Sequence, residues 1–264
     1  MAGTAQGGRT GLESPLERFE PISLEQLDAI RLMNRVDTKY VTTAEDLARL
    51  LEAAAPHYYA LETETGKVTP YDTLYFDTPD LAMYLMHHNR RLHRVKVRVR
   101  RYGNSGLTFL EVKRKDNHGR TKKKRMPVEG FSLDAGAEDF LMARSGYRPE
   151  ELAPALETTF RRITLTDKEM TERITIDTDL RFDNLRTHLS GGLGDLAVIE
   201  LKQDAFTPSR MSAILRELHI RPLRVSKYCI GTALTAPAVK QNNFKLKLRQ
   251  LNKLSHASAS TPGL

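Results

Sequence analysis

Apolar and charged positions alternate through much of the chain and predict a fold built mainly from β-strands. In residues 94–102 the sequence reads Arg-Val-Lys-Val-Arg-Val-Arg-Arg-Tyr. Side chains two residues apart share one face of a strand, so the valines lie on one side and most of the cations on the other. Strand-forming residues predict eight strands, at 72–77, 92–102, 107–115, 121–128, 159–166, 172–179, 195–202 and 223–227.

Amphipathic segments predict helices between and around these strands. The first covers 23–33, with Ser23 as N-cap and Gln26 completing a capping box, and the second covers 43–55, with Thr43 as N-cap. Further helices are predicted at 79–88, 137–145, 207–218 and 228–236, and hairpin turns at 103–106 and 117–119. The composition predicts a disordered leader at residues 1–14 and one folded domain over 15–236. It predicts a basic, flexible tail at 237–264, with a disordered end at 255–264.

Most of the predicted strands have one apolar and one charged face, and this pattern fits two architectures. The first is an open sheet with helices on one side and water on the other. Adjacent basic strands on an open sheet repel one another, however. The second is an α+β fold with a closed eight-stranded antiparallel β-barrel, helices packed outside and a charged lumen compensated by anions or paired carboxylates. We expect the barrel.

The composition narrows the class of protein. The chain has 264 residues, of which 40% are hydrophobic and 28% charged, and its single cysteine excludes an intrachain disulfide. No segment is apolar enough to span a membrane and no secretory signal is visible, so we expect a cytoplasmic protein. The eight histidines show no metal-ligand spacing. No Ser-His-Asp set, P-loop or dinucleotide-binding glycine motif occurs.

The net charge of +8 is concentrated in one part of the sequence. Residues 90–125 hold fifteen lysines and arginines against two acidic residues, whereas residues 1–236 as a whole carry only +3. This concentration indicates a particular anionic partner. Nucleic acid is disfavoured, because the segment offers only Tyr102 and Phe109 for stacking on bases.

Nine short motifs in a fixed order resemble a known family. They are RVDTKY (35–40), YFDT (75–78), RVR (98–100), LEVKRK (110–115), KKR (123–125), FRR (160–162), RITID (173–177), IELK (199–202) and SKY (226–228). In this order and spacing they are similar to the VTC domain of polyphosphate polymerases, a branch of the triphosphate tunnel metalloenzymes. The resemblance spans roughly residues 15–235.

The resemblance implies an eight-stranded tunnel that binds a triphosphate by its phosphates. It implies metal-dependent transfer of a phosphoryl group from ATP to a growing inorganic polyphosphate chain, with Mn²⁺ or Mg²⁺ as cofactor. The alternatives are a non-catalytic module that binds polyphosphate or inositol phosphates, and a tunnel triphosphatase. Because the fungal relatives are attached to membranes, a membrane protein is a further possible partner.

The matching positions name the candidate site. The resemblance implies phosphate contacts and catalytic roles for Lys39, Arg98, Arg100, Lys113, Arg162 and Arg173. It implies substrate binding by Lys123, Arg125, Arg224, Ser226 and Lys227. A shift of one residue would replace Lys123 by Lys122 or Lys124. Salt bridges of Arg162 and Arg173 to Asp177 or Asp179 are the structural alternative.

Glu200 is the first candidate metal ligand and Glu111 the second, because a hard divalent cation needs carboxylate oxygen. Either glutamate could instead neutralise a neighbouring cation: Lys202 or an arginine of the lumen for Glu200, and Lys113 or Arg98 for Glu111. Arg35-x-Asp37-x-Lys39 stands where the wider superfamily carries Glu-x-Glu-x-Lys, which disfavours the two-metal triphosphatase branch. Arg224 also departs from the family's lysine but keeps its charge.

Overall fold

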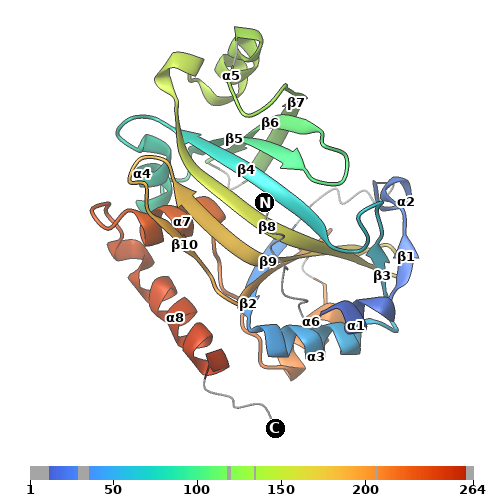
Figure 1. Ribbon diagram of the computed structural model, residues 1–264. Coiled ribbons are helices and arrows are strands. Elements are labelled where there is room, and N and C mark those ends of the chain that lie inside the picture. Colours follow the sequence, from blue (N-terminus) through green and yellow to red (C-terminus); the bar gives the residue numbers. More distant parts are fainter. Residues whose placement is uncertain (1–11, 29–35, 118–119, 134, 206, 260–264) are drawn as a thin grey trace, which may run out of the picture.

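A long antiparallel sheet organises the protein, whose computed structural model describes residues 12–28, 36–117, 120–133, 135–205 and 207–259. Eight strands pair in one path and curl into a half-barrel (Figure 1). In the order of the path they are β2 (Val36–Thr42), β11 (Ala197–Gln203), β9 (Glu172–Asn184), β8 (Ala153–Asp167), β4 (Thr69–Asp77), β5 (Arg94–Tyr102), β6 (Thr108–Lys115) and β7 (Thr121–Pro127). Each neighbouring pair on this path is antiparallel.

Three short strands extend the sheet at its margins. β1 (Glu20–Ile22) pairs in parallel with β3 (Tyr58–Leu61), β3 pairs with β8, and β10 (Ser190–Gly192) pairs with β9. The path ends at β2 and β7, and no pairing between these two is found in the part of the chain that the structure describes. The predicted antiparallel eight-stranded path is therefore confirmed, as a half-barrel rather than a hydrogen-bonded closed barrel.

Helices cover the outer, apolar face of the sheet in two groups. α1 (Glu13–Glu17), α3 (Ala44–Ala54) and α6 (Arg210–Glu217) pack against Ile163, Ile174, Ile176 and Ile199 at the β8–β9–β11 end. α5 (Glu138–Ser145), preceded by a 3₁₀ turn (Ala135–Ala137), packs against the valines of β5 and against β6 at the other end. Figure 1 shows these groups at the bottom and top of the molecule.

A third group packs at one end of the inner face. α7 (Lys227–Thr235) lies against β8 and β9 and is flanked by α4 (Ala82–His88) and α8 (Lys245–Ala259). Tyr228 of α7 is buried beside Tyr75 of β4, with ring centroids 5.0 Å apart. The elements outside these groups are α2 (Leu24–Asp28) and the 3₁₀ turns Pro149–Glu151 and Asn242–Phe244. None of the described helices is both long and apolar enough to cross a membrane.

Most predicted elements are present with shifted ends. Both predicted helix starts are confirmed: Ser23 and Gln26 exchange hydrogen bonds of 3.0 and 3.2 Å, and Asp46 N–H donates to Thr43 Oγ1 at 3.2 Å. Positions 29–33 of the first predicted helix, 118–119 of the second predicted turn and 260–264 lie outside the described residues. In the first hairpin Gly106 takes a φ of +66°, a conformation that glycine adopts at little cost.

One predicted strand is wrong, and β2 of the main path was not predicted, nor were the short marginal strands β1, β3 and β10. Residues 223–227 make no ladder, because Ser226 is the N-cap of α7 and its hydroxyl accepts from Cys229 N–H at 3.4 Å. The eighth strand of the path is instead β2, whose β-forming residues Val36, Tyr40 and Val41 pair with β11. Lys39 consequently lies in a strand rather than in a loop.

Helices form in parts of the two end segments for which disorder or flexibility was expected. Residues 13–17 form α1 and residues 245–259 form α8. Leu16 is buried in the core beneath α3, and Phe244 and Leu251 are buried beside α4 and α7. Burial of these apolar side chains holds the two end helices against the rest of the protein. The predicted domain boundary at residue 236 stays a prediction.

We predict that Gly231→Ala destabilises the protein. A Cβ at position 231 would lie 2.6 Å from the Phe182 ring and 2.7 Å from Leu156 Cδ2. Such overpacking costs roughly 1–3 kcal/mol. Leu234→Ala in the same helix is the control, because Leu234 is 42% exposed and its truncation should cost under about 0.5 kcal/mol. Equal urea midpoints for the two variants would contradict the packing of α7 on β8 and β9.

Candidate functional site

The inner face of the half-barrel carries far more positive than negative side chains. Strand register places one alternating set of side chains from each of the eight strands on this face, and most of these side chains are polar. Its cations include Lys39, Lys96, Arg98, Arg100, Lys113, Lys123, Arg125, Arg162, Arg173 and Lys202, and its carboxylates are Asp37, Glu111, Asp177 and Glu200. Lys227 of α7 joins them from the packed end. The predicted alternation of faces is therefore present.

Glu111 is a buried counter-charge at the β5–β6–β7 end. It is 1% exposed, and Arg98 Nε donates to its Oε2 at 2.8 Å while Lys123 Nζ donates to its Oε1 at 2.9 Å. Tyr102 OH adds a third donor at 3.3 Å. Burial opposes ionisation, but the attraction of Arg98, Arg100 and Lys123 outweighs it and lowers the pKa of Glu111. Both oxygens of this carboxylate are thus engaged by protein donors.

Asp177 plays the same part at the β8–β9 side. Arg162 forms a two-pronged ion pair with it, Nε to Oδ1 at 2.6 Å and Nη2 to Oδ2 at 2.9 Å. Lys227 Nζ, brought in by α7, donates to the same Oδ2. Burial raises the pKa of Asp177, but Arg162 and Lys227 outweigh that effect and lower it. The salt-bridge alternative therefore holds for Arg162, although the guanidinium still borders the inner face.

Glu200 is surrounded by lysines. Lys39 Nζ contacts Oε1, and Lys202 Nζ lies 3.8 Å from Oε2. Its side chain is 20% exposed, compared with 1% for Glu111 and 4% for Asp177. Burial opposes ionisation of Glu200, but Lys202, Lys39 and Lys113 lower its pKa well below the usual range. Among these three carboxylates Glu200 is the most accessible.

Opposite sides of the curled sheet influence each other electrostatically. Burial lowers the pKa of Lys113 on β6 to about 8, and Glu200 on β11 is the largest influence that opposes this shift. Burial likewise lowers the pKa of Lys202 to about 8, again opposed by Glu200. Strands near the two ends of the path therefore share one charged space. Part of its positive charge is lost at mildly alkaline pH.

Two aromatic rings support the cations at the centre of the face. Tyr71 and Phe160 stack with centroids 5.3 Å apart and planes inclined by 3°. The Arg100 guanidinium carbon lies 5.5 Å from the Tyr71 centroid, and that of Arg162 lies 5.0 Å from it. Lys227 Nζ lies 4.4 Å from the Phe160 centroid. Such cation–π contacts stabilise buried cations without neutralising them.

The start of α7 points toward the inner face. Lys96 Nζ donates to Ser226 Oγ at 2.7 Å, and Lys227 reaches Asp177. Backbone N–H groups at a helix start add positive potential to that of the two lysines. Ser226 and Lys227 therefore lie with the predicted phosphate-binding cations.

The remaining predicted residues lie further from this centre. Lys123 rather than Lys122 or Lys124 faces inward, and Arg125 lies on the same face at the exposed edge strand, 4.7 Å from the Phe109 ring. Arg173 donates to the Leu27 carbonyl of α2, and its Nη2 lies 4.0 Å from Asp28 Oδ1, so these contacts direct it toward α2. Arg224 is exposed before α7 and acts electrostatically on Lys247 of α8 rather than on this cluster.

Four residues that border the inner face were not predicted from the sequence. Lys96, Lys202, Tyr71 and Tyr75 border the same face, and Arg98 Nη1 donates to Tyr75 OH at 3.2 Å. The alternation of strand faces already indicated Lys96 and Lys202, because Lys96 lies two residues before Arg98 and Lys202 lies two residues after Glu200. No sequence signal brings the two tyrosines under the arginines, since that contact depends on how β4 pairs with β5.

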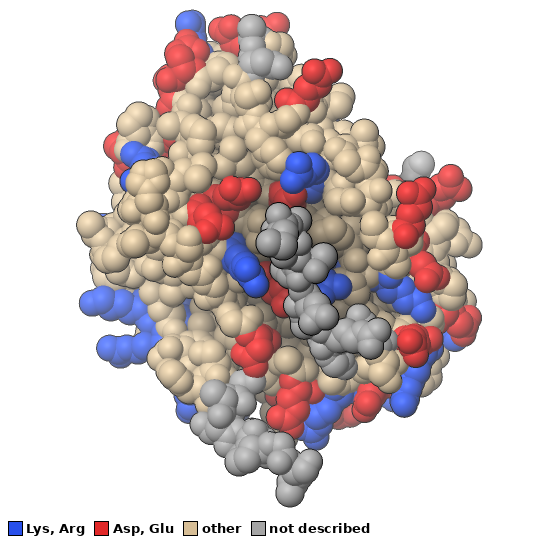
Figure 2. All heavy atoms as spheres, viewed as in Figure 1, with Lys and Arg blue, Asp and Glu red and all other residues tan. Residues whose placement is uncertain are grey.

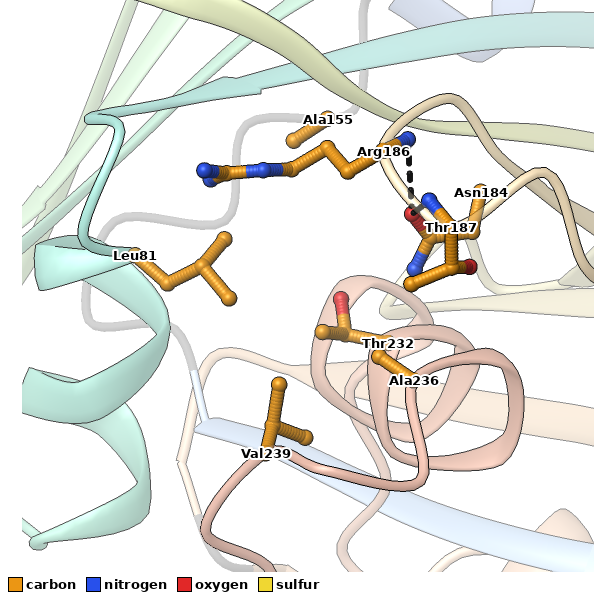
Figure 3. Close-up of a pocket in the computed structure, with 8 residues that line it drawn as sticks. All are labelled: Leu81, Ala155, Asn184, Arg186, Thr187, Thr232, Ala236 and Val239. Atoms are coloured by element: carbon orange, nitrogen blue, oxygen red, sulfur yellow. Dashed lines mark hydrogen bonds between the residues drawn. The ribbon is translucent and has the colours of Figure 1, made fainter.

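A cavity of about 110 Å³ lies elsewhere, between α4, α7 and the β9–β10 turn. Figure 3 shows Leu81 and Val239 on one side of it and Asn184 and Thr187 on the other. Its polar groups already have partners: Arg186 N–H donates to Asn184 Oδ1 at 3.0 Å, and the Arg186 guanidinium binds the Thr78 carbonyl. The face in Figure 2 shows lysines and arginines interspersed with acidic residues. Neither this cavity nor the surface in Figure 2 has the excess of positive charge that the inner face carries.

Comparison with known proteins agrees with this geometry. The family described as VTC domain matches residues 34–236, most of the chain. The chain belongs to the VTC domain family. A comparison with curated proteins gives no match.

Solved structures similar to this VTC domain share little sequence with it. HpAC1 from Hippeastrum, whose description reports a dominant triphosphatase activity, has a TM-score of 0.49 and 14% identity over 76% of this chain and 96% of its own. A candidate adenylate cyclase from Vibrio parahaemolyticus has a TM-score of 0.46 and 13% identity over 76% and 99%. PH1819 from Pyrococcus horikoshii has a TM-score of 0.43 and 14% identity over 74% of this chain and 97% of its own.

The carboxylates of the VTC domain limit how it can hold a divalent metal. No group of three or more His, Cys, Asp or Glu side chains suited to a metal occurs among the described residues. A cation held only by protein ligands therefore does not fit. Mg²⁺ and Mn²⁺ are often held by one or two carboxylates together with substrate phosphates. Glu200 fits that use, because its oxygens contact only lysines that phosphate could attract away.

We predict that Glu111→Gln strongly destabilises the VTC domain. The substitution leaves Arg98 and Lys123 without their buried counter-charge, and removing one partner of a buried ion pair costs about 3–5 kcal/mol. Asp72→Asn is the control, because Asp72 also binds an arginine, Arg101, but at the exposed surface. That loss should stay below about 1 kcal/mol. Urea unfolding that gives the two variants equal losses would contradict a structural role for Glu111.

We predict that ATP binding without metal weakens as the pH rises through 8. Lys113 and Lys202 have pKa values of about 8 in the empty protein. A bound polyanion favours their charged forms and raises these pKa values, so binding takes up protons above about pH 8. The phosphates of ATP are already ionised there. Calorimetry in buffers of different ionisation enthalpy measures the uptake. An uptake that persists in Lys113→Met/Lys202→Met would show that other groups are responsible.

Proposed function

We propose that this VTC domain transfers the terminal phosphoryl group of ATP to a growing inorganic polyphosphate chain, with a divalent metal. The observation that carries the proposal is the uncompensated positive charge of the inner face. Buried cations are costly without anions, and Glu111 and Asp177 neutralise only part of them. A linear chain of phosphates supplies negative charge along the whole face.

In this proposal the arginines of the inner face bind phosphate oxygens, and the lysines around Glu200 stabilise negative charge. Arg98, Arg100 and Arg162 present planar guanidinium groups suited to phosphate oxygens, and the rings beneath them restrict their motion. Lys39, Lys113 and Lys202 surround Glu200 and would neutralise the group in transfer. A metal bound through Glu200 would supply further stabilisation of the developing negative charge. Orientation and electrostatics are the main contributions a protein makes to phosphoryl transfer.

The choice of acceptor follows from the protonation of the site. The end of a polyphosphate chain is anionic and can attack without losing a proton. A water molecule must lose a proton to attack. Glu111 and Asp177 are weak bases, because their pKa values are lowered and both oxygens of each accept from arginine or lysine. This favours transfer to phosphate over hydrolysis by a tunnel triphosphatase. Polyphosphate as product and Mn²⁺ as metal remain parts of the proposal.

Incubation of the purified protein with ATP and Mn²⁺ separates the candidate functions. Polyphosphate on a gel, together with ADP, is the expected result. Release of inorganic phosphate without polymer would instead identify a triphosphatase. Binding of ATP without either product would identify a module that only binds phosphates. Mg²⁺ in place of Mn²⁺ tests the choice of metal.

We predict that Glu200→Gln separates turnover from binding. The change removes the charge that a hard cation needs, so metal-dependent turnover should fall by about 100-fold or more. Binding of metal-free ATP should hold or tighten, because Lys39, Lys202 and Lys113 lose a competing carboxylate. Asp72→Asn, which changes the same charge at the outer surface, should leave both unchanged. Full activity of Glu200→Gln would exclude Glu200 as a metal ligand.

A further inference from the structure

Edge strand β7 is cationic on both of its faces. Lys123 and Arg125 face inward, whereas Lys122 and Lys124 alternate with them and face outward. The other strands place mainly apolar residues on their outer face, under helices. The outward lysines of β7 instead line a groove of about 210 Å³ between β6, β7 and α5, together with Val112, Arg114, Ala143 and Arg144.

The charged residues of this groove are all positive. Arg114 lies directly opposite Lys122 in the strand pair, a like-charged arrangement that destabilises a sheet. Arg114 donates to the ring nitrogen Nε2 of His93 at 3.2 Å, which brings no negative charge. No carboxylate lines the groove, and none of its four cations has an ion pair within the described part of the chain. We call these four residues, Arg114, Lys122, Lys124 and Arg144, the outer cluster.

A linear anion suits the outer cluster better than a compact one. The cations come from three elements, β6, β7 and α5, and lie along a groove whose floor, Val112, is buried. No aromatic side chain lines the groove, so it has no platform for stacking nucleic acid bases. A chain of phosphates needs only charge.

We propose that the outer cluster is a second binding site for linear polyphosphate, outside the inner face. The identity of the ligand rests on the proposed function. β7 then separates two sites for the same polymer, with Lys123 and Arg125 on the inner face and Lys122 and Lys124 on the outer. Long chains can contact both sites, whereas tripolyphosphate, which is limited to three phosphates, is held by the inner face.

The test compares two ligands and two matched double variants of the full chain. Lys122→Ala/Lys124→Ala removes two charges from the outer cluster. Arg216→Ala/Arg221→Ala removes two exposed charges near α6 and is the control for net charge. Affinities for tripolyphosphate and for long-chain polyphosphate are measured by calorimetry at fixed salt, and thermal unfolding checks that both variants fold.

Long-chain affinity should fall by roughly three- to tenfold in the outer-cluster variant, the size expected for two exposed charge contacts. Tripolyphosphate affinity should not change, and the control should bind both ligands normally. Unchanged long-chain affinity, an equal loss in the control, or an equal loss for tripolyphosphate would each overturn the second site. If the outer-cluster variant lost affinity for single-stranded DNA to the same extent, polyphosphate would not be the specific ligand of the outer cluster. Failure of the unmodified protein to bind tripolyphosphate would instead count against the proposed function.

Discussion

The structure depends on keeping an excess of cations on a partly buried surface. Charged groups removed from water are costly, and like charges side by side add to that cost. The fold meets this constraint with the buried carboxylates Glu111 and Asp177, which connect cations from different elements. Aromatic rings under Arg100 and Arg162 assist without removing charge. The remaining positive charge is available to an anionic ligand.

The same constraint distinguishes the three carboxylates. Glu111 and Asp177 are nearly inaccessible and bind arginine as well as lysine. Glu200 is more exposed and its ion pairs are to Lys39 and Lys202. Burial lowers the pKa values of Lys202 and of the nearby Lys113, which reduces their positive charge. The lysine-bound carboxylate is therefore the one whose partners can rearrange when phosphates and a metal arrive. This difference assigns counter-charge roles to two residues and a candidate metal role to the third.

Local sequence patterns predicted much of the fold and of the inner face. The period of two in β5 and β6 placed Arg98, Arg100 and Lys113 together, because it depends only on strand geometry. β2 was missed because its adjacent residues Tyr40 and Val41 place apolar side chains on both faces, which interrupts the alternation of one apolar and one charged face. The partner of Arg173 could not be predicted, because it is a backbone carbonyl of α2, distant in sequence. Likewise, the helix α8 depends on burial against α4 and α7 rather than on its own basic composition.

The central claim is that the inner face of the half-barrel binds a chain of phosphates. A crystal structure of the protein with tripolyphosphate and Mn²⁺ tests it most directly. The account predicts phosphates in contact with Arg98, Arg100 and Arg162, and Glu200 as a residue that holds the metal. Tripolyphosphate bound elsewhere, with the ion pairs of Glu200 to Lys39 and Lys202 unchanged, would contradict it.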